Sequence, residues 1–524
     1  MNNDIKRMIK IEERMMQIAT EDLNLDLVPI EFDIIPPQKM LEIMSYRIPT
    51  NISNWKFGRD YEHLRTIHEN VDAGLPYEVV INSDPSRAYL MKSNPFAVQI
   101  LVMAHVIGHV AFFTMNRYYK NSRKDIIEMM LESSRRISKY ESMYGLDEIE
   151  QTVDAGHALQ FHSSPFHTET ETEKIRRIFE QEKQMIHKKN ISEYSDISDI
   201  GIAKKDINED IELFNQKLLR SLKLKTPVEP TEDILRYIID NSRILENWQK
   251  DILEVLRSEG QYFWPIIKTK FMNEGFATFI HENIMDKLFK EGLLTGSDHA
   301  QYNFSNSLVK AEHPKGMNPY LIGSKMWEDI RDRWDKGKHG SEWKNCADMK
   351  QKEDWDTKDM KGYDKIIETM KSYTDWFFMQ EFLTTELVND LKLYVYMIVE
   401  QHQHYDYVIT RHQAEEMRNM IVNSFAHSGI PKIEVVDGNY QDKNQMHLIH
   451  RWSGLNLDKK YAEETMKHIY RLWGKNITLE TKIGNKPVQY IIRSMKDIKS
   501  KPSRSSSSLI QYTTPLDKNY HITL

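Results

Sequence analysis

The stretch Phe271–Glu282, FMNEGFATFIHE, decides how the rest of the chain is interpreted. Glu274 and His281 stand two helical turns apart, so they share one face if the segment is a helix. A carboxylate and an imidazole on a common face suit a metal site, but they need further ligands from elsewhere in the chain. The best candidates lie far upstream, in the run HVIGH at residues 105–109.

His105 and His109 are spaced by about one helical turn, so both imidazoles can reach one metal ion. Two histidines and a carboxylate are a common catalytic zinc set, in which water takes the fourth position. The sequence therefore predicts a zinc site made of His105, His109 and Glu274. If His281 fills the fourth position, the site is closed and structural. An HxxxH pair also arises by chance, and each histidine could be a hydrogen-bonded core residue. The apolar surroundings favour the metal, because two buried imidazoles need polar partners.

Length and composition set the broad class of the protein. With 524 residues we expect two or more domains, or one domain with large insertions. A chain that is 40% hydrophobic and 28% charged is typical of a soluble globular protein. The net charge of −7 gives no basic field, so we expect no nucleic-acid partner. The single cysteine, Cys346, excludes an internal disulfide and fits a reducing compartment.

No targeting or membrane-spanning segment is predicted. Residues 1–22 form a charged amphipathic helix without the apolar core of a signal peptide. The run Ala97–Phe113 is apolar, but it is short for a membrane span and contains Gln99 and both histidines. We interpret it as a buried helix and expect a cytoplasmic protein.

The hydrophobic periodicity predicts a mainly α protein with a small N-terminal β element. Strands are expected at Tyr77–Asn82 and Ala88–Met91, before the apolar helix, and a later helix is expected at Phe382–Met397. Towards the C-terminus the period changes. A helix at Lys459–Leu472 lies between two pairs of strands, which predicts a C-terminal α+β domain of ββαββ order, with strands at 432–436, 446–452, 477–482 and 488–493.

Changes in composition divide the chain into five predicted regions. Residues 163–227 are rich in Glu, Lys, Ser and Thr, which is typical of a mobile insertion. The serine run Ser505–Ser508 is interpreted as belonging to a disordered tail rather than as a phosphorylation site. The predicted regions are an N-terminal region over residues 1–162, the charged insertion over 163–227, a helical region over 228–430, the α+β domain over 431–499 and the tail over 500–524.

The segment Asn273–Ala277, NEGFA, resembles the Asn-Glu-Gly-Phe-Ala segment of zinc aminopeptidases of the gluzincin group. In those enzymes the glutamate is the third zinc ligand, one helix away from an HExxH pair. The resemblance implies a gluzincin-like helical core with Glu274 as a ligand. The chain departs from that pattern at Val106, where an HExxH enzyme has the glutamate that activates the metal-bound water.

Another residue must therefore move the proton if the protein is a hydrolase. His281 and Glu282 are the predicted catalytic residues, because they lie on the same helix as Glu274. Glu128 and Glu132, on the helix after the histidines, are alternatives. A general base must lie within hydrogen-bond reach of the water.

Short segments spread along the chain form a recognisable set: NWKFG, YEVVIN, HVIGH, ENWQ, NPY and LWG, which begin at residues 54, 77, 105, 246, 318 and 472. With these segments the chain, apart from residues 163–227 and the tail, resembles the SpoVR family, the stage V sporulation protein R-like proteins. The chain departs from the family pattern at Ala111, where an acid is expected, and at Phe276, where Trp is usual.

This resemblance implies a cytoplasmic protein that is tied to spore cortex formation in spore formers. In organisms that do not sporulate, it implies a role in a stress response. It also implies two partners, a serine protein kinase and a von Willebrand A-type protein, which are often encoded beside family members. It implies no particular biochemical activity.

Two functions are therefore open. The first is a zinc-dependent metallohydrolase that acts on a peptide or peptidoglycan-type substrate, and it requires the three ligands to converge within about 5 Å. The second is a non-catalytic scaffold or regulator with a metallohydrolase-like core that works through protein partners, favoured by Val106 and the charged insertion. The sequence contains no P-loop, GxGxxG or GxSxG motif, so nucleotide binding and serine hydrolase chemistry have no support.

Overall fold

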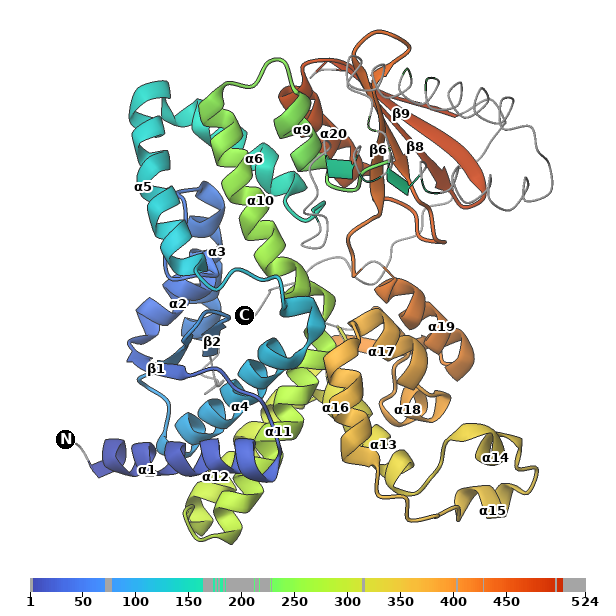
Figure 1. Ribbon diagram of the computed structural model, residues 1–524. Coiled ribbons are helices and arrows are strands. Elements are labelled where there is room, and N and C mark those ends of the chain that lie inside the picture. The colour runs from blue at the N-terminus through green and yellow to red at the C-terminus, as the bar shows by residue number, and fades with distance from the viewer. Residues whose placement is uncertain are drawn as a thin grey trace, which may run out of the picture. The chain divides into compact units, whose positions relative to one another are not determined.

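The computed structural model describes residues 3–70, 78–163, 229–312, 316–401, 404–426, 428–494 and 497–502, with isolated positions between 173 and 227. These residues form two compact units. Unit 1 contains the described residues up to Lys139 and those of Tyr262–Gly429, and unit 2 contains those of Tyr140–Gln261 and those from Ile430 onward. The sequence of unit 2 therefore interrupts that of unit 1. Figure 1 labels the helices, and those strands for which there is room, in both units.

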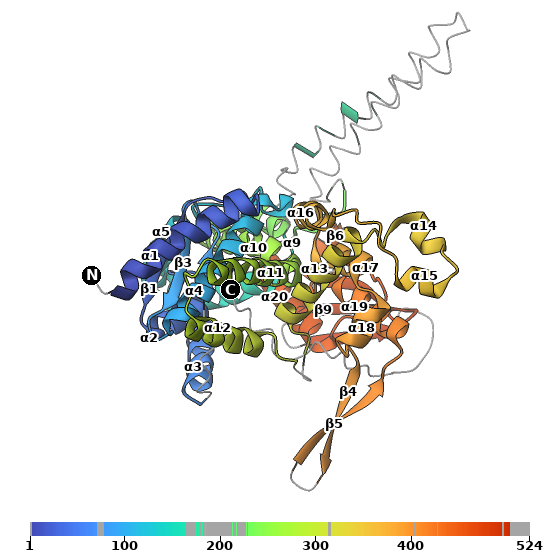
Figure 2. The same ribbon diagram turned by 90° about the horizontal axis from the view of Figure 1, so that it is seen from below.

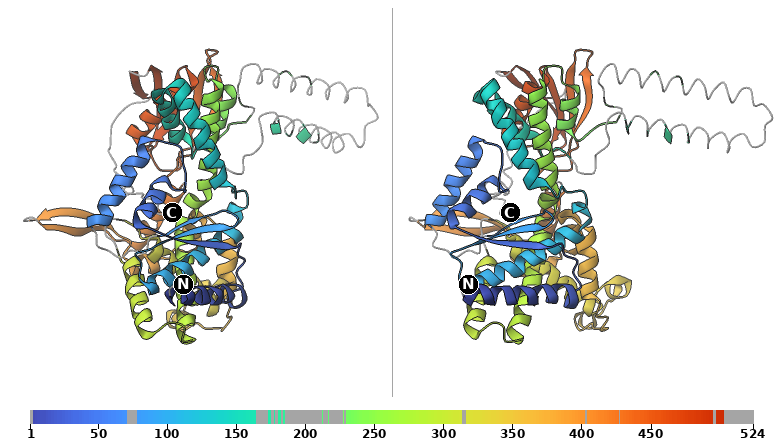
Figure 3. Two further views of the ribbon diagram at one scale, coloured as in Figure 1. Left: turned by 90° about the vertical axis from the view of Figure 1, so that its left-hand side faces the viewer. Right: turned by 60° about the vertical axis from the view of Figure 1, so that its left-hand side comes forward.

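A three-stranded sheet opens unit 1. Its strands are β1 (Ile30–Ile35), β2 (Glu78–Ile81) and β3 (Ser86–Met91), in the order β1-β3-β2. β1 pairs parallel with β3, and β2 pairs antiparallel with β3 at the sheet edge. The sheet lies between helix α2 (Pro37–Tyr46) and helix α4 (Phe96–Met115), as Figure 3 shows. The two predicted strands are confirmed as β2 and β3.

Helix α4 is the apolar helix of the sequence, and it begins directly after Pro95. Every residue from Ala97 to Phe113 is buried. Within the described residues it is the one helix long and apolar enough to cross a membrane, and 94% of its most apolar window is buried inside the protein. The interpretation of this run as a buried helix is confirmed.

Helix α11 (Lys270–Lys290) packs between α4 and α13 (Pro319–Asp335). Glycines make both contacts close. A Cβ atom added at Gly108 of α4 would lie 2.6 Å from the Cα of Ala277, and one added at Gly275 would lie 2.3 Å from backbone atoms of Gly323 in α13. The glycine of the NEGFA segment therefore has a packing role, because no larger side chain fits between the two helices.

The apolar core of unit 1 includes buried side chains of α1, α4, α11, α13, α16 and α17. The helices of this unit not yet bounded are α1 (Asn3–Gln17), η1 (Ile18–Asp22), α3 (Trp55–Asn70), η2 (Arg117–Tyr119), α5 (Ile126–Tyr144, whose last residues are assigned to unit 2), α12 (Gly296–Val309), α14 (Gly340–Asn345), α15 (Met349–Glu353), α16 (Gly362–Ser372), α17 (Asp375–Phe382), α18 (Thr385–Asp390) and α19 (Ala414–Phe425).

The predicted helix over Phe382–Met397 is wrong. Helix α17 ends at Phe382, and the short helix α18 then begins after Thr384, whose side chain accepts a hydrogen bond from the backbone N–H of Leu387. Lys392 has a positive φ of 48°, which is incompatible with a continuing right-handed helix. The chain then forms β4 (Val395–Gln401) and β5 (His404–Arg411), an antiparallel hairpin that projects beyond α18 in Figure 2.

Unit 2 contains a five-stranded sheet of order β10-β9-β8-β7-β6. Helix α20 (Lys459–Trp473) connects the parallel neighbours β7 and β8, as in the predicted ββαββ order, and β10 adds a fifth strand that was not predicted. The strands are β6 (Ile433–Tyr440), β7 (Gln445–His450), β8 (Ile477–Ile483), β9 (Lys486–Ser494) and β10 (Asp497–Pro502). The apolar core of the unit also draws on α6 (Leu146–Leu159), α9 (Ile234–Asn241) and α10 (Asn247–Lys268).

The predicted fold class is confirmed as mainly α, with small sheets that include a C-terminal sheet domain. Strand β10 pairs with β9 and runs to Pro502, three residues into the tail predicted from residue 500. Residues 503–524, with the serine run, and almost all of the predicted insertion 163–227 lie outside the described residues. The boundaries of the five predicted regions stay a prediction.

Candidate metal centre

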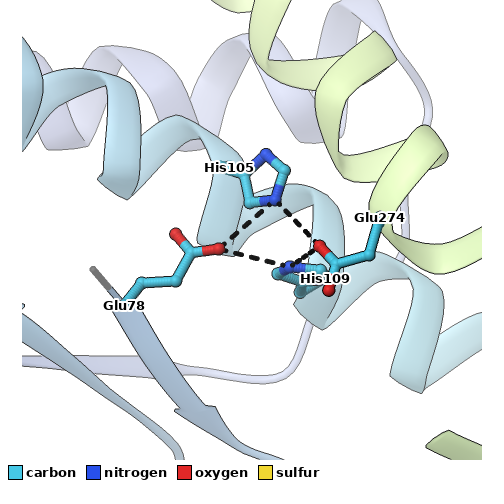
Figure 4. A group of neighbouring side chains, drawn as sticks. All are labelled: Glu78, His105, His109 and Glu274. Carbon is cyan, nitrogen blue, oxygen red and sulfur yellow. Dashed lines mark ion pairs between the residues drawn. The ribbon is translucent and has the colours of Figure 1, made fainter. Parts of the chain in front are cut away.

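Four polar side chains converge inside unit 1, and we call them the centre. They are Glu78 at the start of β2, His105 and His109 on α4, and Glu274 on α11. One ligand atom from each lies within 4.8 Å of those of the other three, and each residue is no more than 7% exposed. Figure 4 shows the two carboxylates reaching the imidazoles from opposite sides. The structure thus brings together the three residues that the sequence grouped and adds Glu78.

The distances within the centre suit a metal ion. Glu78 Oε1 lies 3.3 Å from His105 Nε2 and 3.5 Å from His109 Nε2. Glu274 Oε2 lies 3.6 Å and 3.5 Å from the same two nitrogens. Ligands bonded at about 2.1 Å around a tetrahedral zinc ion are about 3.4 Å apart. Both carboxylates therefore lie at ligand distance from the two histidines, at separations that differ by at most 0.3 Å.

The second ring nitrogen of each histidine binds a side chain of α11. His109 Nδ1 lies 2.9 Å from Asn273 Oδ1, and His105 Nδ1 lies 2.8 Å from His281 Nδ1. Because an amide oxygen only accepts, His109 carries its proton on Nδ1 when neutral, and the lone pair of Nε2 faces the carboxylates. Metal-binding histidines commonly donate their other N–H in this way.

The donor set passes a test of fit for a divalent cation. His105 Nε2 and Glu274 Oε2 are buried and, among the described residues, have no hydrogen-bond partner. Buried polar atoms normally have a hydrogen-bond partner, and an ion between the four groups would give a partner to both of these atoms. A divalent ion would bind both atoms and balance the charges of two carboxylates, and imidazole and carboxylate are ordinary zinc ligands.

The charges of the centre couple strongly. Burial alone lowers the pKa of His109, but contacts with Glu274 and Glu78 outweigh it and raise the pKa of His109 to about 10. Burial raises the pKa of Glu274, but His105 and His109 hold it well below its usual range. The two carboxylates therefore demand a positive charge between them, which a proton supplies in the absence of a metal ion.

Tyr320 adds a hydroxyl group beside the centre. Its ring lies 5.8 Å from the ring of His105, and its hydroxyl group is close enough to Glu274 and Glu78 to be influenced by their charges. Burial, together with the charge of Glu274, raises the pKa of Tyr320 well above its usual value, so the phenol stays neutral. Asn318 places it, because the Asn318 side chain accepts from the backbone N–H of Tyr320 at the start of α13.

The two predicted catalytic residues lie outside the centre. His281 is 2% exposed and stands behind His105, and burial lowers the pKa of His281 well below its usual value. Glu282 is one step further away, because its Oε1 accepts hydrogen bonds from Asn306 Nδ2 at 2.8 Å and Lys310 Nζ at 2.9 Å. The alternatives Glu128 and Glu132 do not belong to the centre, which is the only group of side chains with metal-site spacing among the described residues.

Sequence reasoning missed Glu78. The residue stands in a strand of otherwise apolar, β-branched residues, and its side chain is buried, as is every other residue of β2. A charged residue in a fully buried strand needs a partner. That signal was present in the segment YEVVIN, which precedes β3 and the histidine helix in the sequence.

Comparison with known proteins agrees with the resemblance seen in the sequence. The family described as SpoVR like protein matches residues 2–430, and the SpoVR-like C-terminal domain matches residues 431–484. A similar protein is the uncharacterized protein YcgB of Escherichia coli (strain K12), which is 28% identical over 477 residues, or 87% of this chain and 88% of that protein. No solved structure matches the chain, so the gluzincin-like core stays a prediction. The chain belongs to the SpoVR family.

Proposed function

We propose that this protein binds one divalent transition-metal ion in the centre, with zinc as the first candidate. The observation that carries the proposal is the convergence of four buried ligand groups within 4.8 Å of one another. Two carboxylates balance the charge of one divalent ion, and two neutral imidazoles complete an N2O2 donor set. The buried atoms without a partner, His105 Nε2 and Glu274 Oε2, both belong to this set.

Elemental analysis of protein purified without chelators tests metal binding. We expect about one zinc ion per chain in the wild type and a loss of that zinc in His109→Ala. His299→Ala, on the half-exposed helix α12, is the control, because His299 lies outside the centre and should leave the metal content unchanged. Wild-type protein without metal after growth in zinc would contradict the proposal.

We further propose that the centre is that of a metal-dependent hydrolase acting on a peptide or peptidoglycan-type substrate. Val106 leaves the chain without the HExxH base, but Glu78 brings a carboxylate from β2 to the same two histidines, 3.3 and 3.5 Å from their Nε2 atoms. The bound ion would supply Lewis-acid chemistry and lower the pKa of a water molecule. In this case Glu78 would not bind the ion itself but would accept the proton of that water, and His105, His109 and Glu274 would be the protein ligands.

Tyr320 fits the same chemistry as a hydrogen-bond donor. Its neutral hydroxyl lies beside Glu274 and would stabilise the oxyanion that forms when water attacks a carbonyl group. The class of substrate is proposed from the resemblance of the NEGFA segment to that of zinc aminopeptidases.

A non-catalytic scaffold or regulator is the second candidate, and the position of Glu78 itself favours it. The carboxylates of Glu78 and Glu274 lie at nearly equal distances from the histidines, so both would act as ligands. A zinc ion with four protein ligands is typically structural. The burial of all four residues fits that role.

Glu78→Gln separates the two candidates. If Glu78 is the base, the variant should keep about one metal ion per chain and lose hydrolysis of a peptide library by about 10²–10⁴-fold. If Glu78 is a ligand of a structural site, metal affinity and melting temperature should fall together. Glu128→Gln, an exposed glutamate on α5, is the matched control and should change neither. Hydrolysis that is lost in a folded Glu274→Gln variant would contradict the scaffold.

We also propose, from family membership, a cytoplasmic role in spore cortex formation or, in organisms that do not sporulate, in a stress response. The serine protein kinase and the von Willebrand A-type protein are the proposed partners. Reciprocal affinity purification of tagged proteins from the native organism should recover all three together, and purification of each alone would count against these partners.

A further inference from the structure

The two histidines of the centre are supported differently. Asn273 supports His109 directly through its amide oxygen, 2.9 Å from Nδ1. His105 is instead supported by another imidazole, that of His281, with the two Nδ1 atoms 2.8 Å apart. A hydrogen bond between two ring nitrogens contains one proton, which either ring could hold. What lies beyond His281 decides which ring holds it.

Asn306 of α12 lies on the far side of His281. Its Oδ1 is 3.1 Å from His281 Nε2, and its Nδ2 donates to Glu282 Oε1 at 2.8 Å. Lys310 Nζ also donates to that oxygen of Glu282, at 2.9 Å, so the carboxylate acts as an acceptor for both. The amide of Asn306 is therefore fixed in one orientation, with its oxygen towards His281.

The fixed orientation of the Asn306 amide determines which ring nitrogens of His281 and His105 carry a proton. Because Asn306 Oδ1 only accepts, His281 donates from Nε2, and its Nδ1 then presents a lone pair. His105 donates to that lone pair from Nδ1, so its Nε2 has no proton and points its own lone pair into the centre. His105 Nε2 is the buried nitrogen without a hydrogen-bond partner.

We propose that His281 is a positioning residue that fixes the tautomer and ring orientation of His105, and that Asn306 and Glu282 hold His281 for this task; the inference rests on the proposed metal binding. Both ring nitrogens of His281 are engaged and the side chain is 2% exposed, so the ring has no free nitrogen for a substrate proton. Glu282 acts through Asn306 and does not reach the centre.

There is an electrostatic reason for an imidazole, rather than a carboxylate, behind His105. The centre already contains two carboxylates, which one divalent ion balances. A third carboxylate behind His105 would leave a net negative charge in a buried site, which is costly. His281 and Asn273 are both neutral acceptors, so they orient the ligands without disturbing the charge balance of the centre.

Three proteins test the proposal: the wild type, His281→Leu and His281→Asn. Leucine removes the acceptor for His105 Nδ1, whereas the side-chain oxygen of asparagine can take the place of Nδ1. Zinc affinity is measured by competition with a chelator, and the coordination of the site by the absorption spectrum of the cobalt-substituted protein. We expect His281→Leu to lose about 10–100-fold in zinc affinity and to alter the cobalt spectrum, and His281→Asn to recover most of both.

Substitutions in α12 test the same positioning role of His281 at positions that are not buried. Asn306→Leu should lower zinc affinity in the same direction as His281→Leu, because it frees His281 to change its tautomer. Asn303→Leu, an exposed position one turn away on the same helix, is the matched control and should bind zinc as the wild type does.

The outcomes separate this inference from the proposed function. If the wild type binds no metal, both fail. If the wild type binds zinc but His281→Leu and Asn306→Leu bind it within about threefold as tightly with unchanged cobalt spectra, the positioning role alone is overturned. A His281→Asn variant that is as impaired as His281→Leu would also overturn it, because the hydrogen bond would then not be the cause.

Discussion

Asp375 caps the helix that carries Glu274, although it lies far away in the sequence. Its carboxylate accepts hydrogen bonds from the backbone N–H groups of Phe271 and Met272, each at 2.9 Å. The residue at the helix start, Thr269, makes no side-chain cap of its own. Asp375 therefore satisfies the free N–H groups at the start of α11 and fixes the position of the helix along its axis.

Asp375 is buried, and its burial makes the stability of the protein depend on pH. Burial raises the pKa of Asp375 to about 7, even though the two backbone N–H groups lower it. An aspartate in the unfolded chain has a pKa of about 3.9. Because the folded protein holds this proton more tightly, the contribution of Asp375 to stability is full below about pH 4 and is lost as the pH rises to about 7.

Asp375→Asn removes this pH dependence and leaves one acceptor oxygen for two N–H groups. We expect the free energy of unfolding to fall by about 1–3 kcal/mol at about pH 5. The difference from the wild type should be smaller at about pH 8, where the wild type has lost its own contribution. Urea unfolding at the two pH values measures both differences. A difference that grows with pH would contradict the raised pKa.

Whether the sequence could predict a residue of the centre depended on how local its signal was. His105 and His109 were found because their spacing along a helix is a local signal. Glu274 was found through its neighbours in the NEGFA segment. Glu78 and Asp375 were missed because their partners are distant in the sequence, and local patterns contain no information on such pairs.

At the scale of elements, the centre depends on how closely α4 approaches α11. Gly108 lies between His105 and His109 on one helix, and Ala277 lies between Glu274 and His281 on the other. A Cβ atom at Gly108 would lie 2.6 Å from the Cα of Ala277, so the backbones are in contact. The contact between Gly108 and Ala277 therefore brings the histidines of α4 close to Glu274 of α11.

Gly108→Ala should therefore force the two helices apart. We expect a loss of about 1–3 kcal/mol in the free energy of unfolding and a lower zinc content, because the ligands separate. Gly58→Ala in α3 is the matched control, since a Cβ atom there meets nothing within 4 Å, and it should raise stability by roughly 0.5–1 kcal/mol. Thermal unfolding and elemental analysis measure both variants. Equal stability of Gly108→Ala and the wild type would show that the helices can adjust.

Element type was predictable where the hydrophobic period was unambiguous. Helix α4, helix α11 and the ββαββ order of the C-terminal sheet follow from their patterns. The run from Phe382 to Met397 failed because its apolar residues fit a helix or a strand equally well. The positive φ of Lys392 and the antiparallel partner β5 decide the outcome, and neither is visible in that run.

At the scale of the whole molecule, the four ligand residues all belong to unit 1. Binding of a metal to the folded state stabilises the unit that contains the site. Removal of the metal should therefore raise amide hydrogen exchange in α4, α11 and β2, while α20 and β8 of unit 2 keep their protection. Hydrogen exchange followed by mass spectrometry, with and without a chelator, measures this. Equal loss of protection in both units would contradict a site confined to unit 1.

The interruption of unit 1 by the sequence of unit 2 has a consequence for biosynthesis. A ribosome releases the histidines of α4 first, then the first segment of unit 2, and only afterwards α11 with Glu274. During that interval α4, the one helix of the described residues that is long and apolar enough to cross a membrane, lacks the helix that packs against it in the finished protein. If the centre binds a metal ion as proposed, the ion can be inserted only after Glu274 has been made, which would be late in the synthesis of the chain. A polypeptide that stops before Glu274 exposes α4 and becomes a substrate for chaperones and proteases.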